Sequence, residues 1–129
     1  MMSTQTTILI AENTALGRWA LTHALQARGF EVYSAATWVE AVGWLGRAEV
    51  AVALVSTSLE PARWPEMCGY ARTHHPLTRL VLLAAEDELH EVRARCGSGT
   101  AVFAKPIDVE QVVAAVQEIV EDDRSALRA

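Results

Sequence analysis

Residues 52–59 of the chain, VALVSTSL, join an apolar run to a turn of three hydroxyl side chains. The run from residue 50 to residue 55 is continuously apolar, which is typical of a parallel strand covered on both faces. Open parallel sheets bind their ligands just beyond the carboxyl ends of the strands. Ser56, Thr57 and Ser58 therefore stand where a functional group is expected, and their chemistry decides whether this turn reacts or only binds.

Strand-like and helix-like segments alternate on both sides of this stretch. Further strands are predicted at residues 7–11, 30–35, 80–84 and 101–104. Helices are predicted at residues 15–28, from the cap Thr37 to 45, at 66–73, at 86–95, and from the cap Asp108 to 120. Gly29, Gly46 and Gly97 are expected to close three of the helices, and Pro61 and Pro65 to lie in a loop. This order predicts an α/β fold with a doubly wound, five-stranded parallel sheet and helices on both faces.

Length and composition set the outer limits of the interpretation. The 129 residues, 51% of them apolar, fit a single domain over residues 1–129, with a core from about 7 to 120 and a polar tail at 121–129 that is expected to fray. A net charge of −5 disfavours direct binding of nucleic acid. The apolar stretches are too short to span a membrane, and the first residues lack the basic flank of a signal peptide, so a cytoplasmic location is expected. The two cysteines, Cys68 and Cys96, suit a reducing compartment.

The residues just after each strand are the candidates for a site. They are Glu12 and Asn13, residues 56–58, residues 84–86, and Lys105 with Pro106. The first of these turns lacks the glycines and the lysine of a phosphate-binding loop, and no cofactor is expected. Cys68, His74 and His75 have no fourth partner for a metal, so no metal site is expected there either.

Three segments in this order, ILIAEN, LVS and FAKPID, resemble the receiver domain of bacterial two-component response regulators. The resemblance extends from about residue 7 to residue 120. It implies an acidic pair after the first strand and a phosphoryl-accepting aspartate after the third, which together hold Mg²⁺. It also implies that a hydroxyl residue after the fourth strand and a lysine after the fifth bind the phosphoryl oxygens.

Carried over position by position, the resemblance describes a degenerate pocket. The acidic pair corresponds to Glu12 and Asn13, the acceptor to Ser56, the hydroxyl position to Ala84, the lysine to Lys105 and the aromatic switch position to Val102. One carboxylate remains, so Mg²⁺ is not expected to bind tightly, because it prefers anionic oxygen ligands. Lys105 is instead predicted to form a partly buried ion pair with Glu12.

The leading hypothesis is a phosphorylation-independent pseudo-receiver, which is not an enzyme and acts as a regulatory interaction or dimerisation module. Its partner would be a histidine kinase, a phosphotransfer protein or an output protein, as the resemblance implies. One alternative is a residual phosphoryl acceptor that uses Ser56 or Glu60. The other is a small-anion sensor in which Lys105 acts with Arg63 or Trp64.

Tryptophans mark the candidate interfaces. On the first helix Leu21 and Leu25 are expected to face the core, while Trp19 and His23 project to another side. Trp44 similarly falls off the apolar stripe of its helix, and large aromatic residues outside a core stripe are enriched at binding surfaces. The resemblance also implies a homodimer through the last helix, whose apolar residues are first of all core.

Overall fold

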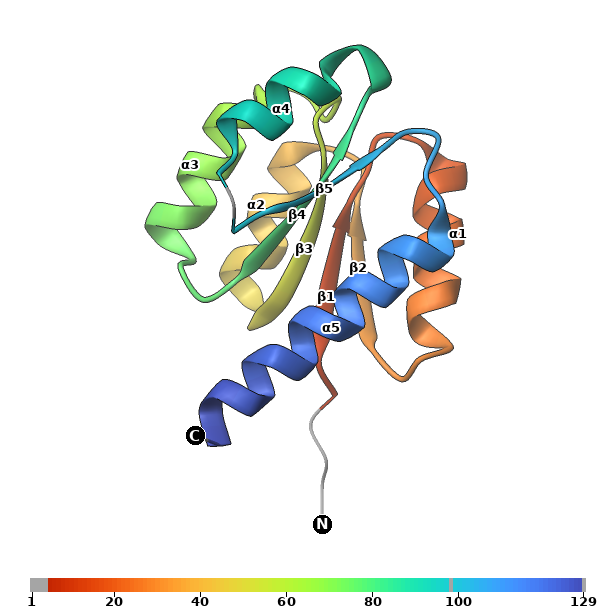
Figure 1. Ribbon diagram of the computed structural model, residues 1–129, viewed down its shortest axis with the longest axis vertical. Coiled ribbons are helices and arrows are strands. Elements are labelled where there is room, and N and C mark those ends of the chain that lie inside the picture. The colour runs from red at the N-terminus through yellow and green to blue at the C-terminus, as the bar shows by residue number, and fades with distance from the viewer. Residues whose placement is uncertain (1–4, 98, 129) are drawn as a thin grey trace.

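The computed structural model describes residues 5–97 and 99–128 and contains one five-stranded parallel sheet (Figure 1). The strands are β1 (Thr7–Ala11), β2 (Glu31–Ala35), β3 (Val50–Ser56), β4 (Arg79–Ala84) and β5 (Ala101–Ala104). Their order across the sheet is β2-β1-β3-β4-β5, and every neighbouring pair is parallel. The predicted fold class is confirmed. Among the described residues no helix is long and apolar enough to cross a membrane.

Helices cover both faces of the sheet. They are α1 (Ala15–Gln26), α2 (Trp38–Arg47), α3 (Trp64–His74), α4 (Leu89–Arg95) and α5 (Val109–Arg128), with a 3₁₀ turn at Glu86–Glu88. Helices α1 and α5 pack on one face, and α2, α3 and α4 pack on the other (Figure 1).

The side chains of β1 alternate between the two faces of the sheet, so that this one strand contributes to both hydrophobic clusters. Ile8 and Ile10 lie in the cluster under α1 and α5, whereas Leu9 and Ala11 lie in the cluster under α2, α3 and α4. All four are fully buried, because successive side chains of a strand point to opposite faces. Glu12 follows the last residue of this strand and is buried against the core.

Several predicted helix boundaries are wrong. Gly46 does not close α2, which runs on to Arg47 and ends at the cap Ala48, because a helical glycine costs only about 1 kcal/mol and no turn is required there. Pro65 lies in the first turn of α3 and not in a loop, since a first-turn position has no intrahelical partner to lose. Gly29 and Gly97 do follow helix ends, with φ of 88° and 84°.

The tail from Glu121, which was expected to fray, is helical, and α5 continues through Arg128. Arg79 forms a 2.7 Å salt bridge to Asp123, and the Arg124 guanidinium donates to the Thr6 hydroxyl at 3.0 Å. These contacts hold the polar turns of α5 against β4 and the residue before β1. Residues 1–4 and 129, which the expected domain includes, lie outside the described residues.

Candidate functional site

Four of the predicted site residues meet at the carboxyl ends of β1, β3 and β5. The Lys105 ammonium donates to Glu12 Oε1 at 2.5 Å, to Ser56 Oγ at 2.8 Å and to Asn13 Oδ1 at 3.1 Å. The ion pair expected between Glu12 and Lys105 is therefore present. A lysine ammonium carries three protons, and here each has an acceptor on the protein.

Ser56 is equally saturated. Its hydroxyl accepts from Lys105 Nζ and from the Ser58 amide at 3.2 Å, and it donates to Asn13 Oδ1 at 3.1 Å. A serine hydroxyl offers one donor and two acceptor positions, and all three are occupied. The side chain is also fully buried, with no exposed surface.

Glu12 joins this cluster to the start of α1. Its second oxygen, Oε2, accepts from the Thr14 amide at 2.7 Å and from the Thr14 hydroxyl. The Thr14 hydroxyl in turn accepts from the Gly17 amide at 3.2 Å and so caps α1. Arg18 adds a 2.8 Å hydrogen bond to the Glu12 carbonyl oxygen. Both carboxylate oxygens of Glu12 thus accept hydrogen bonds within the protein, and the side chain is only 1% exposed.

The pKa of Glu12 reflects this balance. Burial by itself raises the pKa, because it disfavours the charged form. Hydrogen bonds from Lys105 and Thr14 stabilise the carboxylate and outweigh burial, so the pKa lies below its ordinary value. Glu12 is therefore an anion near neutral pH.

The glycine at position 17 allows close packing around Glu12. A Cβ atom on Gly17 would lie 2.7 Å from Thr14 Oγ1 and 2.9 Å from Glu12 Oε2, well inside van der Waals contact. The glycine lets the first turn of α1 approach the carboxylate. Composition and spacing did not single out Thr14 or Gly17, although a threonine directly before a helical run is a recognisable cap signal.

The remaining strand-end positions hold no phosphate-binding group. Ala84 is fully buried, and Val102 is half-buried against the core under α2, α3 and α4. Thr57, one of the three hydroxyl residues expected at the turn after β3, is buried, and its hydroxyl accepts from the Ala85 amide at 3.3 Å. Thr57 thereby joins the turn after β3 to the turn after β4.

Comparison with solved structures decides the fold family. The receiver domain of a CheY-like response regulator from Methanospirillum hungatei JF-1 superposes with a TM-score of 0.83, at 19% identity, over 95% of this chain and 99% of that one. The signal receiver domain of an HD domain-containing protein from Pseudomonas fluorescens Pf-5 superposes with a TM-score of 0.83, at 18% identity, over 95% of this chain and 99% of that one. A response regulator receiver domain protein from Clostridium thermocellum superposes with a TM-score of 0.83, at 13% identity, over 94% of this chain and 98% of that one. The chain has the receiver fold. Its sequence matches no family model and no curated protein.

Within the receiver fold, this pocket is short of ligands for a cation. Glu12 is its one carboxylate, and both oxygens of that carboxylate are bound within the protein. Asn13 Oδ1 already accepts from Lys105 and Ser56. Among the residues that the structure describes, no group of three His, Cys, Asp or Glu side chains is placed to hold a metal ion.

The Ser56 and Lys105 pair has the atoms of a nucleophile and a base, 2.8 Å apart. A lysine acts as a base only when it is neutral, and Lys105 donates to the Glu12 carboxylate as an ammonium. Ser56 is also closed off from any substrate by its burial. The arrangement is a hydrogen-bonded cluster and not a catalytic pair.

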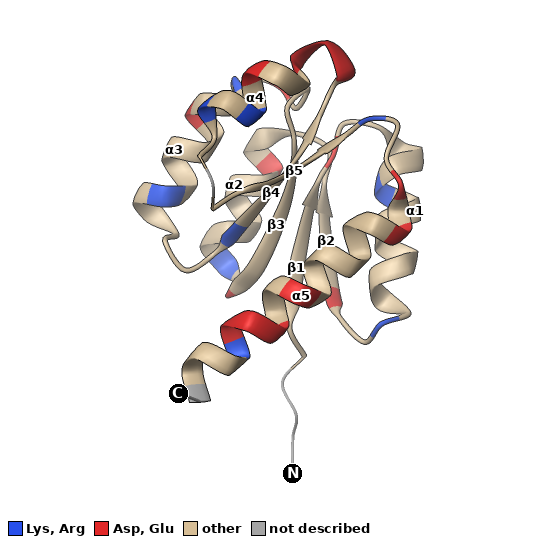
Figure 2. Ribbon diagram, viewed as in Figure 1, with Lys and Arg blue, Asp and Glu red and all other residues tan. Residues whose placement is uncertain are grey.

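A hollow of about 560 Å³ opens beside the cluster, between α1 and the β5–α5 turn. We call it the α1 groove; one wall is Glu12, Thr14, Leu16, Gly17, Ala20 and Leu21, and the other is Lys105, Pro106, Ile107 and Val109. Leu16 at its rim is 76% exposed and Trp19 on the same helix is 61% exposed. The Trp19 ring packs on His23 with 4.5 Å between centroids. Helix α1 contains no acidic residue, and Arg18 is its one Lys or Arg (Figure 2).

Trp44 occupies a different environment from the one expected. It is half-buried at the edge of the core, where its ring stacks on Tyr33 with centroids 4.2 Å apart. The Arg47 guanidinium covers the ring at 4.8 Å from its centroid. Its place off the apolar stripe of α2 did not indicate this packing, because Tyr33 is distant in the sequence; an interface role for Trp44 stays a prediction.

The proposed anion-binding residues are not brought together. Arg63 and Trp64 line a hollow of about 490 Å³ between the β3–α3 turn and α4, which Lys105 does not line. Trp64 is buried there, with the Arg95 guanidinium 5.5 Å from its ring centroid.

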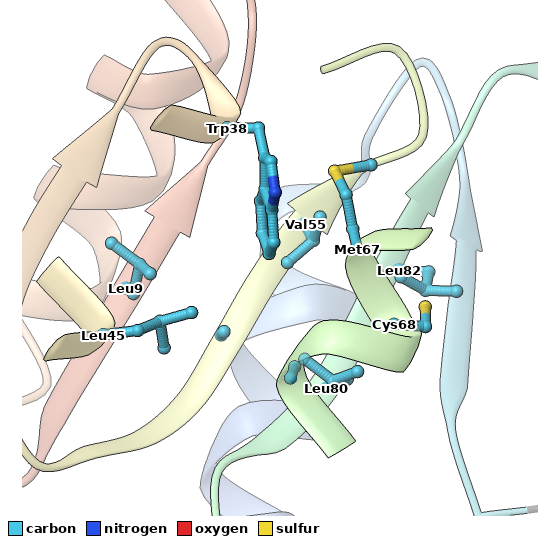
Figure 3. A pocket seen from close by; sticks show the side chains of 10 residues that line it. Leu9, Trp38, Leu45, Val55, Met67, Cys68, Leu80 and Leu82 are labelled. Atoms are coloured by element: carbon cyan, nitrogen blue, oxygen red, sulfur yellow. The ribbon is translucent and has the colours of Figure 1, made fainter. Parts of the chain in front are cut away.

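The core under α2 and α3 contains an apolar cavity of about 10 Å³ (Figure 3). Its lining includes Leu9, Trp38, Met67 and Cys68, and it offers no polar group to a ligand. This volume is about that of one water-sized probe, so the cavity is a packing defect and not a binding site. Burial raises the pKa of the Cys68 thiol, which makes it unreactive.

Proposed function

We propose that the chain is a phosphorylation-independent receiver domain that acts as a protein-interaction module in bacterial signal transduction. The observation that carries the proposal is the saturation of Lys105, whose three protons go to Glu12, Ser56 and Asn13. A phosphoryl group would have to displace at least one of these bonds. It would also arrive at a serine whose hydroxyl is buried and fully bonded.

The same observation argues against the anion sensor and against Ser56 as a residual phosphoryl acceptor. An anion sensor needs a free cationic donor, and the charge of Lys105 is balanced by Glu12 at 2.5 Å. A residual phosphoryl acceptor needs a nucleophile, and the Ser56 oxygen has no free acceptor position. A module without its own turnover fits the pocket better than an enzyme does, and we propose that it works in the cytoplasm.

We assign partner binding to the exposed side of α1. Leu16 and Trp19 present largely exposed apolar surface, and the α1 groove continues it as far as Ile107 and Val109. An apolar helix face beside a groove suits an amphipathic helix of a partner protein such as a histidine kinase or a phosphotransfer protein. Because α1 has no carboxylate, it would not repel an acidic partner, as the rest of this negatively charged chain would.

The test of phosphorylation independence is intact-mass measurement after incubation with Mg²⁺ and acetyl phosphate. The native chain is expected to gain no phosphoryl mass, and a stoichiometric Mg²⁺-dependent adduct would refute the proposal. The variant Ser56→Asp, treated in parallel, shows whether the acceptor carboxylate alone is enough to restore the reaction.

The α1 surface is tested by crosslinking the chain to candidate kinase and phosphotransfer domains from the same organism. Trp19→Ser is expected to abolish a crosslink that the native chain forms. Leu77→Ser is the matched control, because Leu77 is a large apolar residue that is 89% exposed and lies outside α1. An equal loss of the crosslink in Trp19→Ser and Leu77→Ser would show that α1 is not the docking surface.

A further inference from the structure

The hydrogen-bonded cluster around Glu12 connects the two walls of the α1 groove. Lys105 belongs to one wall, and Glu12 and Thr14 belong to the other. The Glu12 carboxylate accepts from Lys105 with one oxygen and from Thr14 with the other. An unbroken chain of hydrogen bonds therefore runs from the β5–α5 turn to the first turn of α1.

We propose that this chain of Lys105, Glu12 and Thr14 is a tether that fixes the separation of the two groove walls, so that the docking surface is formed before any partner binds. The inference rests on the proposed function for the role of the groove. The three side chains are positioning residues, because they set the place of the exposed side of α1 relative to Ile107 and Val109.

The geometry gives the tether its stiffness at both ends. At the α1 end, the Thr14 hydroxyl caps the helix through the Gly17 amide, and Gly17, which has no Cβ, lets this first turn pack closely against the carboxylate. At the other end, Lys105 is held by Ser56 on β3 as well as by Glu12. The middle member, Glu12, is 1% exposed, so water does not compete for its oxygens.

Charge makes the tether costly to open. If the walls separated, Glu12 would keep its negative charge inside the protein while it lost the ammonium that balances it. The alternative of moving Lys105 into water leaves the same uncompensated carboxylate. A partner that binds the groove therefore meets one fixed width, and affinity is not reduced by the cost of selecting a minor conformation.

The experiment compares two threonine caps in the free protein by NMR. Thr37 caps α2 as Thr14 caps α1, with 3.2 Å from its hydroxyl to the Glu40 amide, but it does not contact Glu12. Thr14→Val is expected to shift the methyl resonances of Ile107 and Val109 across the groove and to speed amide exchange in the first turn of α1 about tenfold. Thr37→Val is expected to affect only the first turn of α2.

Lys105→Met provides the reciprocal measurement. Breaking the tether from its other end is expected to shift the Leu16 methyl resonances and to raise amide exchange at Gly17, although neither residue contacts Lys105 through a hydrogen bond. If each variant perturbs only its own wall, the tether does not exist, and Thr14 and Lys105 are two separate local contacts. Thr14→Val removes the hydroxyl link and keeps the Thr14 amide bond to Glu12 Oε2. Should Lys105→Met fail to fold, Glu12→Gln, which changes the middle of the tether, is expected to shift methyl resonances on both walls, and a shift on one wall alone would refute the tether.

These outcomes are independent of phosphorylation and of any partner. A phosphoryl adduct on the native chain would refute the proposed function and leave the coupling between the walls as measured. Absent coupling would refute the tether and leave the proposed function standing.

Discussion

The ion pair between Glu12 and Lys105 predicts a large, non-additive loss of stability. Lys105→Met removes the ammonium but leaves a carboxylate that is 1% exposed. Breaking a buried pair from one side costs about 3–5 kcal/mol, and we expect about 3 kcal/mol here because Thr14 still donates to Glu12. Glu12→Gln should cost less, about 1.5 kcal/mol, because Lys105 is 22% exposed and keeps Ser56 and Asn13 as acceptors.

The double variant Glu12→Gln/Lys105→Met leaves no unbalanced charge in the interior. Its loss is expected to be about 2.5 kcal/mol, which is about 2 kcal/mol less than the two single losses together. Equilibrium urea unfolding at neutral pH, followed by tryptophan fluorescence, measures all four free energies. An unchanged dependence on urea concentration would confirm that the variants differ in stability and not in compactness.

The matched control is the exposed pair of Arg79 and Asp123, which has one hydrogen bond of 2.7 Å and side chains that are 42% and 44% exposed. Exposed pairs contribute less than about 1 kcal/mol, so Arg79→Met and Asp123→Asn should combine almost additively. If the Glu12 and Lys105 variants were additive to within about 0.5 kcal/mol, the buried pair would be no stronger than the surface pair and the reasoning would fail.

Three further predictions concern acid, metal and packing. Because the pKa of Glu12 is lowered in the folded state, its contribution to the free energy of unfolding is present above pH 4.5, the ordinary pKa, and is lost as the pH falls through the folded-state pKa. Urea titrations should therefore show that the difference in stability between the native chain and Glu12→Gln becomes smaller in acid. A difference that grows in acid would contradict the lowered pKa. Ser56→Asp combined with Asn13→Asp restores three carboxylates, and calorimetry should detect Mg²⁺ binding at roughly millimolar concentration in this variant and none in the native chain. Gly17→Ala should lower the free energy of unfolding by about 2 kcal/mol because of the clash beside Glu12, whereas Gly46→Ala, in the open on α2, should raise it by about 0.5–1 kcal/mol; equal effects would refute the close approach.

The strands were predictable to within about a residue because their signal is local. The apolar run of β3 and the FAKPID segment around β5 needed no knowledge of their neighbours. Helix ends were less predictable, since Gly46 and Pro65 are signals that also tolerate helical positions. The turns of α5 beyond Glu121 contact Arg79, which lies on a strand more than forty positions earlier, and a sequence pattern contains no trace of that contact.

The site divides in the same way. The pairing of Glu12 with Lys105 followed from topology, because strand ends in a parallel sheet converge. The attachment of Glu12 to Thr14 and the confinement at Gly17 did not, since they depend on distances of a few tenths of an ångström. The stacking of Trp44 on Tyr33 likewise depends on which strand lies under α2.

The charge balance of the pocket has a consequence for what the cell can control. A ligand shifts a conformational equilibrium only as far as it binds the two states differently. Because Lys105 neutralises the charge of Glu12, the pocket needs no added cation or anion, and we expect the conformation of the domain to be insensitive to the concentrations of magnesium and of phosphodonors. Occupancy of its partners would then follow simple mass action, so that the number of copies made, and where they are made, becomes the quantity that conveys information.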